Sequence, residues 1–199
     1  MILTMNPARP HTRRARWTLV GLTIATLLAG GCSTEGPTVP DTYTKLMRRP
    51  DIDQAQATYT EMLTAIRDRL TAEFGRTWEQ RGDLSGAACL NDYPGLNADG
   101  ESRTLPRWLS PGNLPDNQWA RAQTLLGEIA TKYGFQPTPT IRVDKPGEHD
   151  VVYHKRDGLP DETLLYFGTA KNTDISVSTG CHLTADAHRR GGPAPSPGT

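Results

Sequence analysis

The spacing of apolar residues changes near residue 140 of this 199-residue chain, and that change restricts the fold more than any other feature. Before it, apolar side chains recur every three or four positions, whereas after it they alternate with polar ones. The first spacing gives a helix one apolar stripe, and the second gives a strand one apolar face. The helix stripes must therefore be buried against the apolar face of a sheet.

Two helices are predicted before this change. The first begins at Asp51, whose spacing to Gln54 suits a capping box, and it ends at Gly75. The second spans about residues 115–134. The two apolar stripes are Tyr59, Met62, Leu63, Ile66, Leu70 and Phe74 in the first helix, and Trp119, Ala122, Leu126, Ile129, Ala130 and Tyr133 in the second. Stripes of this width are typical of core-facing helices.

Four strands are predicted after the change, with turn signals between them. They are residues 140–143, 149–154, 163–167 and 173–178, and weaker candidates are residues 77–80 and 103–109. The short connections cannot make parallel crossovers, so the strands are antiparallel. The predicted fold class is α+β, with two amphipathic helices packed on one face of an antiparallel sheet of about four to six strands.

The first 31 residues have the features of a secretory signal. Four arginines precede an apolar stretch of 14 residues, and small residues then lead to Cys32. A cysteine in this place is typical of a bacterial lipobox, in which it receives a diacylglycerol and becomes the new N-terminus. We therefore predict a signal peptide over residues 1–31, lipid on Cys32 and a location on the outer face of the cell membrane.

Other interpretations of this segment remain open. A retained transmembrane helix is one, although a spanning helix needs about 20 residues. Ordinary signal cleavage is another, and Arg13-Arg14 could belong to a twin-arginine export signal.

The remaining chain, residues 32–199, has the length of one domain. We expect a flexible tether over residues 32–42, a single α+β domain over residues 43–189 and a disordered Gly/Pro-rich tail over residues 190–199. Removal of the four arginines of residues 1–31 leaves 18 basic and 22 acidic residues. This balance gives no electrostatic case for a nucleic-acid partner, so the predicted partner is the membrane, held through acyl chains.

With Cys32 lipidated, two cysteines remain. We predict a Cys89–Cys181 disulfide, because the outside of the membrane permits disulfides and only these two cysteines can form one. The alternative is a reactive thiol at Cys181 with His182 as its base. Neighbours on a strand point to opposite faces, which is poor geometry for proton transfer.

The chain resembles the LppA-type lipoproteins of actinobacteria. The resemblance lies in the lipobox Gly30-Gly31-Cys32, residues 78–89, residues 129–134 and the run that ends Thr179-Gly180-Cys181. These pieces are short, and their order and spacing over residues 50–185 make the resemblance specific. It implies an exported, anchored lipoprotein with a cysteine pair, and it implies no reaction and no catalytic residue.

The sequence contains no readable catalytic, cofactor or metal motif. His149, His154, His182 and His188 lack a metal-ligand spacing, and the acidic residues Asp150, Asp157, Asp161, Glu162 and Asp174 are expected at strand ends and turns. The long irregular region between the two helices carries Tyr93 and Trp108. These two rings are candidates for exposed aromatic contacts, and the alternative is that both cover the edge of the core.

The leading functional hypothesis is a membrane-anchored, non-enzymatic envelope lipoprotein that binds an envelope protein, glycan or lipid. One alternative is an envelope hydrolase whose acidic and histidine residues converge only in the fold. Another is a carrier of a small ligand or lipid, which needs an apolar cavity of several hundred Å3.

The lipobox interpretation predicts the fate of a Cys32→Ala variant. Without the thiol, no thioether to lipid can form, so the protein should move from the membrane fraction to a soluble or uncleaved form. Cell fractionation followed by immunoblotting measures this. A variant that is still processed and membrane-bound would show that the lipobox interpretation is wrong.

Overall fold

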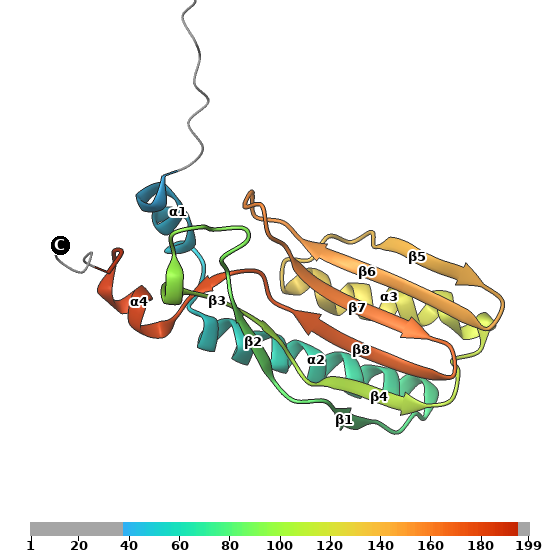
Figure 1. Ribbon diagram of the computed structural model, residues 1–199. Helices are drawn as coiled ribbons and strands as arrows, with labels where there is room; N and C mark the ends of the chain where they lie inside the picture. The colour runs from blue at the N-terminus through green and yellow to red at the C-terminus, as the bar shows by residue number, and fades with distance from the viewer. Residues whose placement is uncertain (1–37, 195–199) are drawn as a thin grey trace, which may run out of the picture. The chain divides into compact units, whose positions relative to one another are not determined.

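The computed structural model describes residues 38–194, and within them four α-helices and a nine-stranded antiparallel sheet form an α+β fold (Figure 1). The predicted fold class is confirmed, but the sheet has more strands than the four to six expected. The predicted signal peptide, Cys32 and the last five residues of the predicted tail lie outside the described residues.

Two long helices cover the sheet, and their ends lie where the sequence predicts them. Helix α2 spans Ile52–Phe74 and helix α3 spans Asp116–Lys132. The Asp51 side chain accepts hydrogen bonds from the free amides of Asp53 and Gln54, at 3.0 and 2.9 Å. Gly75 ends α2 in the left-handed conformation, at a φ of 64°, which glycine adopts without a Cβ clash.

Six strands follow one another across the sheet in the order β1-β4-β8-β7-β6-β5. Their bounds are β1 Glu79–Arg81, β4 Arg107–Pro111, β8 Asn172–Ser178, β7 Thr163–Thr169, β6 Glu148–Lys155 and β5 Thr140–Lys145. Strand β3 (Gly100–Thr104) pairs with β2 (Ser85–Ala88), with the end of β8 and with β9 (His182–Leu183). The hairpins of β5 to β8 are therefore those that the alternation of residues 140–178 predicts.

The main core lies between the sheet and the two long helices. It contains the predicted stripes of α2 and α3 together with alternate side chains of the strands, such as Val151, Leu165 and Ile175. The Trp119 ring stacks between Phe167 and His149, with ring centroids 4.7 and 5.0 Å away. Both helices lie on the same side of the sheet (Figure 1), so the side chains between these core positions point to an uncovered face.

A second, smaller core lies at one end of the domain. It joins helix α1 (Val39–Leu46) and helix α4 (Ala185–Arg190) to the loop after β2 and to β9, through Tyr43, Leu46, Tyr93, Leu96, Leu183 and Ala187. The Cys89–Cys181 disulfide lies within it, with the two Cα atoms 5.9 Å apart. The predicted pairing of these cysteines is therefore confirmed.

The sequence did not indicate α1, α4, β2 or β9, and the start of α1 corrects a predicted boundary. Helix α1 begins at Val39, so residues 39–42 belong to a helix and not to the expected tether of residues 32–42. The Thr38 side chain caps the helix by accepting a hydrogen bond from the Asp41 amide at 3.4 Å. Pro40 lies in the first turn, where a missing N–H costs no helical hydrogen bond.

Arg49 connects three segments beside this small core through ion pairs and a hydrogen bond. Its side chain, 8% exposed, binds Asp157 at 2.6 Å and Asp161 at 2.9 Å, and it also donates to the Cys181 carbonyl. Asp161 accepts further hydrogen bonds from the Tyr93 hydroxyl and the Cys181 amide. The loop between β6 and β7 is thus held to the end of α1 and to the disulfide.

The disulfide should contribute to stability and not to any reaction rate. Cys89→Ser and Cys181→Ser should each lower the melting temperature, and the double variant should be no worse than either, because one bond is lost in every case. The bridge spans 92 positions, and loop-closure entropy gives an upper limit of about 4–5 kcal/mol. Two reactive thiols in the denatured, unreduced protein would contradict the bridge.

Removal of Arg49 should destabilise the fold strongly, because it leaves the carboxylate of Asp161 buried without its cation. For Arg49→Met we expect a loss of about 3–5 kcal/mol in the free energy of unfolding, measured by urea titration. Arg48→Met, at the exposed neighbouring position, is the matched control and should change stability by less than about 0.5 kcal/mol. Equal effects of the two variants would contradict the role of Arg49.

The same contact gives stability a pH dependence. The hydrogen bond from Arg49 lowers the pKa of Asp157 below its unfolded value of about 3.9. The contact therefore stabilises the fold fully above that unfolded value, and this contribution disappears as the pH falls through the lower folded pKa. Unfolding titrations between pH 7 and pH 2 should show a smaller acid-induced loss in Asp157→Asn than in the unchanged protein.

Candidate functional site

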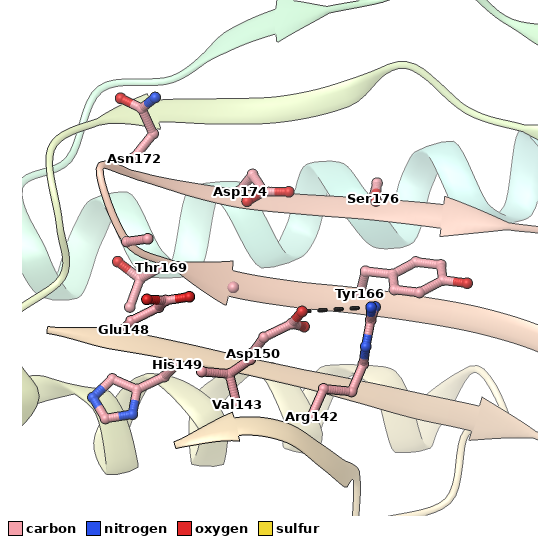
Figure 2. Close-up of a pocket in the computed structure, with 12 residues that line it drawn as sticks. Arg142, Val143, Glu148, His149, Asp150, Tyr166, Thr169, Asn172, Asp174 and Ser176 are labelled. Atoms are coloured by element: carbon pink, nitrogen blue, oxygen red, sulfur yellow. Dashed lines mark ion pairs between the residues drawn. The ribbon is translucent and has the colours of Figure 1, made fainter. Parts of the chain in front are cut away.

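The uncovered face of the sheet carries a hollow of about 420 Å3 (Figure 2). It lies over β5 to β8, on the side opposite α2 and α3. The residues that line it are Arg142, Val143, Glu148, His149, Asp150, Tyr166, Gly168, Thr169, Ala170, Asn172, Asp174 and Ser176. The hollow is therefore built mainly from polar side chains on regular strands, whose positions the hydrogen-bonded sheet fixes.

Gly168 forms the floor of this hollow. In the sheet register it lies opposite Asp150 of β6 on one side and opposite Asp174 of β8 on the other. Neighbouring strands are about 4.8 Å apart, so the two aspartates face each other across a trough about two strand spacings wide. A glycine inside a strand weakens the strand, and it often marks a place where a ligand comes close to the backbone.

A methyl group at this position would fit. A Cβ on Gly168 would lie 3.4 Å from the His149 carbonyl oxygen and 3.8 Å from the Asp150 side chain, which are ordinary contacts. The backbone there is not in the left-handed region, so the conformation does not require glycine. Packing and backbone geometry therefore do not explain the absence of a side chain.

The two aspartates beside Gly168 have different surroundings. Asp150 forms an ion pair with Arg142 at 3.6 Å, which Figure 2 shows as a dashed line. Burial raises the pKa of Asp174, and the positive charge of Arg107 only partly opposes this. Within residues 38–194, no hydrogen bond or ion pair reaches the carboxylate of Asp174. A half-buried carboxylate without a donor is costly, and a donor on a ligand would relieve that cost.

Tyr166 supplies an aromatic surface beside the trough. It precedes Gly168 by two positions on β7, so both lie on the uncovered face, and it pairs with Ser176 of β8. The Arg142 guanidinium lies 5.9 Å from the centre of its ring. Asn172 and Ser176 project from β8 on the same face as Asp174 (Figure 2). The site thus combines one ring with carboxylate, amide and hydroxyl groups.

The two aromatic residues predicted as exposed contacts lie elsewhere. Tyr93 is 4% exposed and its hydroxyl binds Asp161, so the prediction of an exposed contact is wrong for this residue. Trp108 is half-buried against the main core, and the Arg67 guanidinium lies 4.5 Å from its ring centre. Both positions fit the alternative that these rings cover the edge of a core.

The histidines are dispersed and have structural partners. His149 binds Asp144 and Asp116 through its two ring nitrogens, at 2.8 and 3.1 Å, and so ties the β5–β6 hairpin to the start of α3. His154 contacts Glu162 and Thr140. Among residues 38–194, no three His, Cys, Asp or Glu side chains are grouped so that they could hold a metal ion.

Sequence reasoning missed the trough because its parts are far apart in the chain. Asp150 and Asp174 were expected at strand ends, where turn amides would satisfy them, yet both lie within strands. Tyr166 lies in the predicted strand of residues 163–167, but the sequence does not indicate that it points to the uncovered face. The available signal was Gly168, which lies between strand residues where a side chain would be expected.

None of the helices within residues 38–194 combines the length and the apolar character needed to cross a bilayer.

Comparison with known proteins gives a fold and a family. The domain superimposes on the crystal structure of the lipoprotein LppA from Mycobacterium tuberculosis with a TM-score of 0.59 and 15% sequence identity, over 77% of this chain and 92% of that one. A DUF4853 family protein from Actinomyces odontolyticus matches at 13% identity and a TM-score of 0.49, over 69% and 71% of the two chains. No curated protein matches the chain.

The family model is the decisive comparison, because the structural match to LppA shows only a shared fold at 15% identity. The model named LppA, described as a lipoprotein confined to pathogenic Mycobacterium, matches residues 32–185. That range begins at the predicted lipidated cysteine and includes both cysteines of the disulfide and every residue of the trough. The resemblance seen in the sequence is therefore confirmed, and the chain belongs to the LppA family of lipoproteins.

Proposed function

We propose that this protein is a lipid-anchored binding module of the cell envelope and that the trough on its uncovered sheet face binds a saccharide. The observation that carries the proposal is the row Asp150–Gly168–Asp174, in which a bare glycine backbone lies between two carboxylates. The anchor is Cys32, where the family match begins. Attachment there places the domain on the outer face of the membrane.

The chemistry of the trough suits a sugar ring. One face of a pyranose is a patch of C–H bonds that packs on an aromatic ring, and Tyr166 offers such a ring at the side of the trough. The sugar hydroxyls donate hydrogen bonds, and the carboxylate of Asp174 is an acceptor without a donor. A hollow of about 420 Å3 has the size of a site for a small ligand or one to two sugar residues.

A second candidate is the hydrolase alternative, which the contrast between the two aspartates favours. Asp150 is ion-paired with Arg142, whereas burial raises the pKa of Asp174. Two carboxyl groups whose surroundings differ in this way can serve as base and acid. The Asp174→Asn variant distinguishes the two functions. In a binding module it should weaken glycan binding. In a hydrolase it should keep glycan binding and abolish glycan turnover.

Filling the trough should reduce binding without harming the fold. Gly168→Ala adds a methyl group that the structure accommodates, so stability should be unchanged or slightly higher. Binding of the purified protein to an array of neutral, acidic and amino-sugar glycans, followed by calorimetry on the best glycan, should fall about tenfold. Tyr166→Ala should cause at least the same loss.

Two serines on β8 provide a matched control. Ser176 lines the trough, whereas Ser178 lies two positions further along the same face and does not. Ser176→Ala should weaken glycan binding a few-fold, which is the usual effect of one lost hydrogen bond, and Ser178→Ala should leave it unchanged. Equal affinities for all four variants and the unchanged protein would exclude the trough as the binding site.

The raised pKa of Asp174 predicts how glycan binding responds to acid. The ionised carboxylate accepts hydrogen bonds, and burial makes it protonate at a higher pH than an ordinary aspartate, whose pKa is about 3.9. Affinity should therefore decrease as the pH falls through this raised value. Calorimetry at stepwise lower pH should show this decrease in the unchanged protein and a weaker, nearly pH-independent binding in Asp174→Asn.

A further inference from the structure

Few residues separate the start of α1 from the predicted lipid attachment point. Val39 follows Cys32 by seven positions, and a fully extended chain covers at most about 3.6 Å per residue. The helix therefore begins within about 25 Å of the lipidated cysteine. A folded domain of this length has a radius of gyration of about 15 Å, so the α1 end of the domain must remain near the bilayer.

This end of the domain carries a second hollow, of about 290 Å3, and its character differs from that of the trough. It lies between α1, the loop of residues 89–97 and the loop of residues 156–162. Its lining is mainly apolar and consists of Thr42, Lys45, Asp92, Tyr93, Pro94, Leu159 and Pro160. Leu90 lies in the first of these loops and is 53% exposed.

Buried polar contacts fix the two loops that form this surface. The Tyr93 hydroxyl binds Asp161, and Arg49 binds Asp157 and Asp161, so both loops are fixed relative to α1. The fold therefore keeps an apolar surface beside α1, the first element of the described domain.

The local chemistry suits the boundary between lipid headgroups and acyl chains. Pro94 and Pro160 have no backbone N–H that would lose a water partner on entering lipid. Lys45 is exposed at the rim, where a long side chain can place its methylenes against lipid and its ammonium group among the headgroups.

We infer that the surface formed by Pro94, Leu159 and Pro160 rests on the bilayer that holds the lipid anchor, with the exposed Leu90 of the Pro94 loop beside it. The inference rests on the lipid attachment at Cys32 that is part of the proposed function. The lipid tethers the domain, and the bilayer contact also fixes the orientation of the domain. The strands β6 to β8 then run away from the membrane, because β7 begins at the loop of residues 156–162 and ends at the hairpin that contains Lys171.

Quenching of tryptophan fluorescence by brominated acyl chains tests this orientation. The acylated protein is placed in nanodiscs of phosphatidylcholine with brominated chains, as Leu90→Trp or as Lys171→Trp. Both positions are exposed, so both variants should fold, and the unchanged protein gives the background of its native tryptophans. The residue at position 90 should be quenched at least about threefold more than the residue at position 171, which lies a full strand length, about 20 Å, further away.

Leu159→Trp provides an independent position on the second loop, and its quenching should match that of Leu90→Trp. Mass spectrometry of the same samples establishes whether Cys32 is acylated. An acylated protein whose positions 90 and 159 are quenched no more than position 171 would overturn the membrane contact and leave the anchor intact. A protein without acylation would overturn the anchor, and this orientation with it.

Discussion

The fold depends on the burial of two helix stripes against a single face of one sheet. The side chains of α2 and α3 interdigitate with alternate residues of β4 and β6 to β8, and Trp119 stacks between Phe167 and His149 at the centre of this layer. Burial of apolar surface is the main favourable term in folding, and here the larger of the two cores lies on one face of the sheet. The other face is therefore free to carry polar residues and a bare glycine, because core packing makes no demand on it.

The smaller core at the α1 end needs other means of stabilisation. Its buried apolar residues are few, and two of them are the cysteines of the disulfide. Arg49 also joins Asp157 and Asp161 to the end of α1, and removal of one partner would leave a buried charge uncompensated. The α1 end of the domain consists largely of loops, whereas the trough lies on regular strands. The surface proposed to contact the membrane and the surface proposed to bind the ligand therefore differ in secondary structure as well as in chemistry.

Local signals predicted much of the fold, and long-range pairing decided the rest. Asp51 and Gly75 mark the ends of α2 because capping is local chemistry. Strand β2 was missed because its residues are small and exposed, and only pairing with β3 makes them a strand. The burial of Tyr93 depends on a partner 68 positions away. The trough likewise exists only in the register of β6, β7 and β8, which no single segment specifies.

The disulfide encloses the whole trough in one covalent ring. Every residue of the trough lies between Cys89 and Cys181, whereas α1 and α2 precede the ring. Disulfides are rare in the cytosol, so the ring closes only in an oxidising environment. The ring also affects what happens after the chain is cut, which the free energy of unfolding does not describe. If a protease cuts one loop of the ring, the two pieces stay joined through the sulfur atoms, and both walls of the trough remain on one molecule.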